Sequence, residues 1–219
     1  MSVDSLLFFV TAGLLLNLTP GPDVLYIASN ALRHGARAGI AAAFGITAGC
    51  FVHILAAAVG VSALLSASSM AFAVLKWLGA AYLVYVGLRL LMAQGEFAIL
   101  LEASSQGFTG ANPKINYQSI FLRGFGTNAL NPKVALFFLA FVPQFIAPAV
   151  ENKPLAFLLL GLLFNFNGLW VNIGWALAAA WLAQRAGLVQ KSLQVLDRVS
   201  GALFIGFGIK LALTEAPQP

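Results

Sequence analysis

Apolar residues occur in six long runs along the chain, separated by shorter segments that hold most of the polar side chains. A helix needs roughly 20 apolar residues to cross the hydrocarbon core of a bilayer, and every run reaches that length. The predicted membrane-spanning helices cover residues 5–32, 38–66, 70–92, 121–147, 155–183 and 194–213. The pattern therefore predicts an all-α integral membrane protein, with one transmembrane domain over residues 1–219.

Composition supports this class. Of the 219 residues, 60% are hydrophobic and 9% are charged, and the mean hydropathy is +0.90, which is far from the soluble range. The longest polar connection covers only residues 93–119. The first run is expected to be retained as a span rather than cleaved as a secretory signal, because it carries Asp4, lacks a basic start and continues toward Leu32.

Proline interrupts the first and the fourth predicted span. The two interruptions are Asn17-Leu18-Thr19-Pro20-Gly21-Pro22-Asp23 and Asn128-Ala129-Leu130-Asn131-Pro132-Lys133. Proline removes a backbone donor and clashes with the preceding turn, so each interruption frees polar backbone groups at membrane depth. We therefore predict two broken helices whose freed groups contribute to a functional site.

The arrangement of spans predicts an inverted repeat. Three spans lie in residues 1–92 and three in residues 120–219, joined by the loop 93–119, and an odd number of spans reverses the second half. Pro20 in the first half corresponds to Pro132 in the second. With about 1.5 Å of rise per helical residue, both prolines approach the bilayer midplane, where repeat-built transporters bind their substrates.

The net charge of +5 reflects scattered basic residues rather than one basic patch interleaved with aromatics, so nucleic acid is not an expected partner. Alternating the loops between the two sides gives one side an excess of basic residues, and the positive-inside rule makes that side cytoplasmic, with both termini outside. The cytoplasmic set is Arg33, Arg37, Arg89, Lys114, Arg123, Arg185, Lys191 and Arg198, against Lys76, Lys153 and Lys210 outside.

Asp23 and Lys133 are the charged residues of the two breaks. A charge at membrane depth is costly and normally faces a cavity or a partner. Asp23 is expected to bind a substrate ammonium or a proton, although it could instead cap its half-helix. Lys133, at the start of a helix, suits a substrate carboxylate, although the two residues could also form a structural ion pair. A molecule that carries both charges fits such a site.

Amide side chains lie near both breaks. Asn17 and Asn128 are expected to satisfy carbonyls that the breaks release, and Asn131 to cap the helix that Pro132 opens. Asn165 and Asn172 share a face of the fifth span, where amides are too polar for contact with lipid.

Three further features of the chain also lead to predictions. His53 could relay protons or be a hydrogen-bonded residue of the helix interior. Gln144 could line an exit path or end its helix. Gly45 and Gly49 predict a close helix contact of the second span.

No enzyme signature is present: the chain lacks a His-Glu-x-x-His helix, a phosphate loop and a nucleophile elbow. Cys50 is the only cysteine, which excludes a disulfide framework and a cysteine metal site. We expect no cofactor, no metal and no catalysis. A passive channel and a non-transporting scaffold or enzyme subunit remain the alternatives to a transporter.

The ordered set of motifs resembles the lysine exporter (LysE) superfamily, within it the homoserine/threonine/leucine exporter branch. The residues that carry the resemblance are Thr19 to Asp23, Gly35 to Gly39, Gly45-Ile46, Gly49, Lys76 to Leu83, Gly87, Asn128 to Lys133, Phe137-Phe138 and Phe141 to Phe145.

The resemblance implies a six-span exporter of the bacterial inner membrane that works as a homodimer and exchanges amino acids for protons. It also implies that the two proline motifs form the functional centre. Homoserine, threonine, leucine and related amino acids all remain open as substrates.

Overall fold

A computed structural model of the chain describes residues 3–61, 115–147 and 150–183, together with isolated positions between 70 and 92 and between 199 and 209. The regular elements of these described residues are all helices. Within the predicted third and sixth spans, 70–92 and 194–213, only scattered positions are described and all of them are helical, while most of the loop 93–119 lies outside the described residues. The inverted repeat therefore stays a prediction.

Both predicted helix breaks are present. Helix α1 (Val3–Leu18) and helix α2 (Pro22–His34) meet at a bend of 50°. Helix α7 (Tyr117–Ala129) is followed by α8 (Pro132–Leu136), the π-helical turn η2 (Phe137–Phe141) and the 3₁₀ turn η3 (Val142–Phe145), at a bend of 44°. The prediction of proline-broken first and fourth spans is confirmed.

The fourth span begins at Tyr117 rather than at residue 121, which corrects the predicted boundary. The reason is a cap that the hydrophobic pattern does not show. The side chain of Asn116 accepts a hydrogen bond from the amide of Ser119 at 3.0 Å, which satisfies one donor of the first turn.

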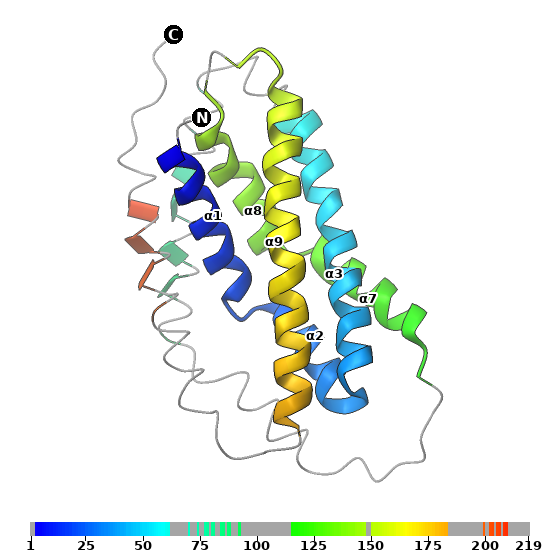
Figure 1. The fold of residues 1–219 in the computed structure, drawn as a ribbon. Helices are drawn as coiled ribbons and strands as arrows, with labels where there is room; N and C mark the ends of the chain where they lie inside the picture. Colours follow the sequence, from blue (N-terminus) through cyan, green and yellow to red (C-terminus); the bar gives the residue numbers. More distant parts are fainter. Residues whose placement is uncertain are drawn as a thin grey trace.

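Among the described residues, two helices are long and apolar enough to cross a membrane without a break. They are α3 (Ala36–Ala56), which continues into the π-helical turn η1 (Ala57–Val61), and α9 (Lys153–Leu182). Figure 1 shows these two helices side by side along the length of the molecule, with α1 and α8 toward one end and α2 and α7 toward the other. The two breaks therefore lie partway along α3 and α9, away from both ends.

Helix α3 packs against α7 with almost no space between the backbones. A Cβ atom added at Gly45 would overlap the carbonyl oxygen of Phe121, and one added at Gly49 would overlap that of Phe125. The predicted close contact is confirmed, and its partner is α7. This contact holds the second break against the middle of α3.

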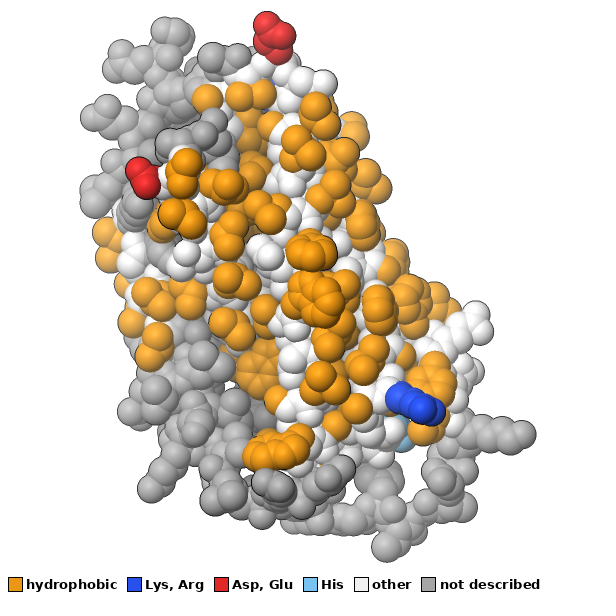
Figure 2. Space-filling model, viewed as in Figure 1, with side chains coloured by type: hydrophobic (Ala, Val, Ile, Leu, Met, Phe, Trp, Pro, Cys, Tyr) orange, Lys and Arg blue, Asp and Glu red, His pale blue; other side chains and the backbone are white. Residues whose placement is uncertain are grey.

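The outer surface has the character of a membrane protein. Figure 2 shows hydrophobic side chains over the middle of one face, with acidic side chains toward one end and a basic side chain near the other. On α9, Leu159, Phe166 and Trp170 are each about three-fifths exposed. Apolar side chains in such numbers are stable on a surface that faces lipid rather than water.

Candidate functional site

A small cavity lies between the two breaks, with a volume of about 20 Å³. Six of the helices contribute to its walls, and most of its polar lining comes from residues that the sequence singles out. The polar lining residues are Asn17, Asp23, Thr47, Asn128, Lys133, Asn165 and Asn172. The volume suits about one water molecule, so this conformation is closed around the site.

Asp23 forms the acidic pole of the cavity. Its side chain is buried, and its Oδ2 atom accepts hydrogen bonds from the Nδ2 atoms of Asn128 and Asn131, both at 2.8 Å. Asp23 lies in the first turn of α2, as the helix-end alternative expects, but its hydrogen bonds are made to the second break and none to the amides of α2. Asp23 instead connects α2 to the second break.

Lys133 forms the basic pole. Its Nζ atom donates hydrogen bonds to the carbonyl oxygens of Leu16 and Thr19, both at 3.1 Å. These carbonyls lie in the last turn of α1 and at the residue that follows it, where a positive charge also complements the helix dipole. Asn17 was expected to satisfy such carbonyls, and the structure assigns that task to Lys133. Gly21 leaves the necessary space, since a Cβ atom there would lie 3.2 Å from Nζ.

Asn131 caps α8, as the sequence predicts. Its Oδ1 atom accepts a hydrogen bond from the backbone amide of Lys133 at 2.9 Å, while Pro132 occupies the first helical position. Its amide nitrogen bonds to Asp23. The side chain of Asn131 therefore both caps the helix that follows the second break and donates a hydrogen bond to Asp23.

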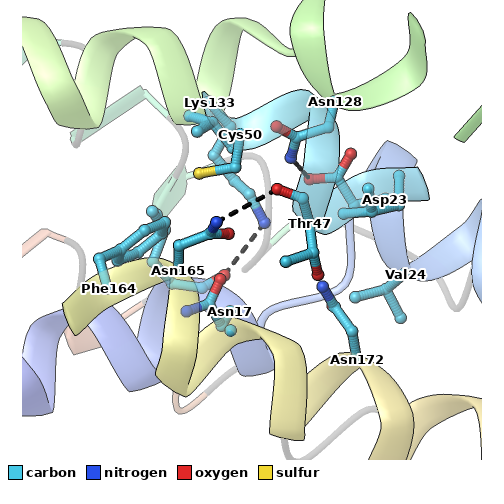
Figure 3. A pocket seen from close by; sticks show the side chains of 14 residues that line it. Asn17, Asp23, Val24, Thr47, Cys50, Asn128, Lys133, Phe164, Asn165 and Asn172 are labelled. Atoms are coloured by element: carbon cyan, nitrogen blue, oxygen red, sulfur yellow. Dashed lines mark hydrogen bonds between the residues drawn. The ribbon is translucent and has the colours of Figure 1, made fainter. Parts of the chain in front are cut away.

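Asp23 and Lys133, both described residues, do not pair with each other. Each is bonded to the opposite break instead. Figure 3 shows Asp23 beside Asn128 on one side of the cavity, and Lys133 toward Asn17 and Asn165 on the other. The alternative of a structural ion pair is wrong for this conformation, and the cavity separates two opposite charges.

Three buried polar atoms beside the cavity have no hydrogen-bond partner within the protein. They are Oδ1 of Asp23, Oδ1 of Asn128 and Nδ2 of Asn17. Buried polar atoms normally find partners, because an unsatisfied one costs roughly 1–3 kcal/mol. Two acceptors at the acidic pole suit an ammonium group. A donor on the side of Lys133 suits a carboxylate.

Helix α9 closes the cavity with the amides that the sequence places on one face. Both Asn165 and Asn172 line the cavity, and Nδ2 of Asn165 donates to the carbonyl oxygen of Thr47 at 3.2 Å. Between them, Gly168 leaves room for the side chain of Asn17, since an added Cβ would lie 3.2 Å from its amide atoms. The expectation that these two amides face the protein interior is confirmed.

His53 and Gln144 do not line the cavity. His53 is buried behind Asn128, which lines the cavity: its Nε2 atom lies 2.8 Å from the carbonyl oxygen of Asn128. Because a carbonyl oxygen can only accept, Nε2 carries the proton and donates it. Gln144 donates from Nε2 to the carbonyl oxygen of Ala140 at 3.3 Å, which is the helix-end arrangement.

Sequence reasoning missed Thr47, Cys50 and Phe164 as lining residues. Thr47 and Cys50 lie about one turn apart and share a face of α3, but this face points away from the one that carries Gly45 and Gly49, so the glycine spacing gave no signal for them. Phe164 stacks on Phe137 with ring centroids 4.6 Å apart. These two rings belong to a buried apolar cluster that also includes Phe9, Phe138 and Phe141.

Within the described ranges, no group of three or more His, Cys, Asp or Glu side chains is placed to hold a metal ion. The site consists instead of two opposite charges, amides and released backbone carbonyls. Broken helices around a buried polar cavity, inside an apolar helical bundle, are the arrangement typical of membrane transporters.

The chain belongs to the LysE type translocator family, whose match covers residues 14–215. Members of this family are transporters and not enzymes. The homoserine/homoserine lactone efflux protein of Salmonella typhimurium is 31% identical over 211 residues, which cover 93% of this chain and 94% of that protein. The leucine efflux protein of Salmonella choleraesuis is 26% identical over 208 residues, with 95% and 94% covered.

An uncharacterized membrane protein of Pseudomonas aeruginosa is 34% identical over 200 residues, which cover 89% of this chain and 88% of that protein. No solved structure gives a significant match. The chain thus aligns with these relatives over nearly their whole length, and the family assignment applies to the entire transmembrane domain.

Proposed function

We propose that this protein exports amino acids by binding the zwitterion in the cavity between Asp23 and Lys133. The observation that carries the proposal is the pair of poles. The acidic pole has two acceptors without partners, Oδ1 of Asp23 and Oδ1 of Asn128, which suit the substrate ammonium. On the other side, Lys133 and Nδ2 of Asn17 suit the carboxylate.

The names of two relatives support this substrate class. Homoserine and leucine share an ammonium and a carboxylate on one carbon and differ in the side chain, whereas homoserine lactone, which the first relative's name also includes, shares only the ammonium. A site built from the two poles binds the shared part. The remaining lining, which includes Cys50 and Phe164, would contact the side chain and set the specificity.

Transport requires the closed cavity to open toward each side in turn. The bonds that close it run between the breaks, from Asp23 to Asn128 and Asn131 and from Lys133 to α1. Substrate binding replaces part of these bonds, which lowers the cost of separating the two halves. In this proposal the halves move against each other about the midplane site.

Proton exchange would use the same acidic pole. A proton on Asp23 removes the charge that attracts the ammonium, so proton and substrate compete for one carboxylate. The protein then acts as a proton antiporter of the bacterial inner membrane, with both termini outside, and the expected dimer would consist of two such units. An inward proton gradient would drive export.

The central experiment is counterflow of labelled amino acids into liposomes that contain the purified protein, as a panel across the common amino acids. We expect uptake of at least one amino acid, and a loss of at least about 100-fold for Asp23→Asn and for Lys133→Ala, because each removes one pole. Asp4→Asn is the matched control, since Asp4 is exposed at the start of α1. Normal counterflow in both variants would refute the mechanism.

Coupling separates an antiporter from a passive channel. Dissipation of the proton gradient should abolish uphill movement of the amino acid while counterflow continues. A channel would leak equally with and without the gradient, and a non-transporting scaffold or enzyme subunit would give no counterflow for any amino acid.

A further inference from the structure

A second and larger cavity lies between the ends of α2 and α7, with a volume of about 350 Å³. That volume is in the range of sites for small molecules. Half of its lining comes from the last three turns of α2, and half from the start of α7 and the residues before it. It is separate from the small cavity between the two breaks, called the midplane cavity below, since the two share no lining residue.

The lining of this cavity is basic. Arg33, His34 and Arg123 are among its ten residues, with amide and hydroxyl groups between them, and none of the ten is acidic. Arginine binds carboxylates in a bidentate geometry. The cavity therefore favours a carboxylate over a cation of the same size.

Tyr26 is the residue of the larger cavity that lies nearest along α2 to the residues lining the smaller one, Asp23 and Val24. It is one helical turn beyond Asp23 on α2 and lines the larger cavity. Its hydroxyl donates to the carbonyl oxygen of Ile120 at 2.8 Å, and its ring packs on Gly124, where an added Cβ would lie 3.3 Å from Cε1. This one side chain thus joins α2 to α7 about one turn along α2 from the acidic pole.

We propose that the basic cavity is a loading site that binds the carboxylate of the solute before it reaches the midplane, and that Tyr26 closes the passage between the two cavities. This inference rests on the proposed export function for the identity of the solute. The charge of the loading site and the role of Tyr26 are testable without transport.

Cys50 provides the test, because it is the only cysteine of the chain and lines the midplane cavity. In neutral detergent, the purified protein is labelled with an anionic and a cationic methanethiosulfonate of similar size. Each rate is divided by the rate of that reagent with a small free thiol. The ratio of the two normalised rates reports the charge preference of the path to Cys50.

Opening the passage should speed labelling by both reagents. We expect Tyr26→Ala to raise both rates by at least about 10-fold, and Tyr26→Phe, which keeps the ring but loses the hydroxyl, by roughly 2- to 10-fold. Tyr117→Phe is the matched control, since Tyr117 is exposed and outside the lining. Rates in Tyr26→Phe and Tyr26→Ala equal to those of the unsubstituted protein would overturn the role of Tyr26.

The charge of the loading site is tested in the Tyr26→Phe background. There, Arg123→Gln should lower the anionic-to-cationic ratio by about 3-fold or more, whereas Arg37→Gln, an exposed basic residue outside the lining, should leave it unchanged. An unchanged ratio in Arg123→Gln would overturn the loading site. So would loss of the preference on adding phosphatidylglycerol, because a lipid headgroup would then occupy the cavity.

The two proposals fail in different experiments. Absence of counterflow for every amino acid, with the labelling pattern as expected, would refute export and leave the cavity and its closure by Tyr26 in place. Normal counterflow, with no effect of the Tyr26 and Arg123 substitutions on labelling, would refute the loading site and leave the export function in place.

Discussion

The two helix breaks satisfy their freed backbone groups in different ways. The second break is capped locally, since Asn131 accepts a hydrogen bond from the amide that follows Pro132. The first break has no side-chain cap at Gly21, and Lys133 of the second break binds the carbonyls that end α1. The first break therefore depends on the second.

The dependence also runs in the other direction. Asp23 of the first break accepts both amides of the second, from Asn128 and Asn131. Each break thus supplies the charge that completes its counterpart. This crossed arrangement explains how an acid and a base can share one cavity without neutralising each other directly, and it leaves room for a ligand that carries both opposite charges.

Substitution of Lys133 should have the largest effect, because it leaves the first break incomplete. Lys133→Met removes two hydrogen bonds from a charged donor and leaves Asp23 as an uncompensated charge. We expect the free energy of unfolding to fall by about 3–5 kcal/mol and counterflow to be lost. Thermal unfolding in detergent measures the first effect. Lys153→Met, outside the cavity, is the control, and equal stability of the two variants would contradict the crossed arrangement.

Substitution of Asn131 should have a smaller effect, because it removes a neutral cap and one hydrogen bond to Asp23 rather than a buried charge. Asn131→Ala should lower the free energy of unfolding by about 1–2 kcal/mol and reduce counterflow. Asn152→Ala is the matched control, since Asn152 caps α9 in the same way, by accepting from Leu155. That control should lose similar stability and keep its transport, and equal transport in both variants would show that Asn131 acts only as a cap.

Substitution of Gly21 tests whether transport depends on the space around the Nζ atom of Lys133, and it should change the stability of the protein little. Its backbone is extended, with φ −171° and ψ −173°, so alanine fits the conformation without strain. We expect Gly21→Ala to change the free energy of unfolding by less than about 0.5 kcal/mol while lowering counterflow by roughly 3- to 10-fold, because the new Cβ displaces the Nζ atom.

Gly126→Ala is the control for this substitution. Gly126 lies in α7 near the second break, and an added Cβ there meets nothing within 4 Å. Wild-type counterflow in Gly21→Ala would mean that the position of Lys133 is not critical.

The substitution His53→Gln should have the smallest effect on counterflow if the role of His53 is its hydrogen bond to the carbonyl oxygen of Asn128. Glutamine can also donate to that carbonyl, so His53→Gln should retain counterflow within about twofold and the wild-type dependence on pH. His53→Ala should impair it. If histidine relays protons, His53→Gln would keep counterflow and lose proton-driven export.

The location of the site could be predicted from the sequence because its residues violate the apolar pattern. Asp23 and Lys133 are charges at membrane depth, and Asn165 and Asn172 are amides on one face of an apolar helix, so each needs an interior partner. The positions of both breaks could be predicted as well, because proline inside an apolar run disrupts a helix. These are local costs, and local costs are visible in a sequence.

The partners could not be predicted, because they depend on how distant helices pack. An ion pair between Asp23 and Lys133 satisfies the sequence as well as the crossed bonds do. Only the three-dimensional arrangement brings Lys133 to the end of α1 rather than to Asp23. The π-helical turns η1 and η2 were also missed, because their residues read as ordinary apolar helix.

The central claim is that one cavity binds both charges of one solute. The most direct measurement is competition for counterflow between the transported amino acid and the amine and carboxylic acid that share its side chain. We predict that the amino acid competes at least about 10- to 100-fold better than either analogue, because each analogue leaves one pole without its charged partner. Equal competition by the amine or the acid would contradict the two-pole site.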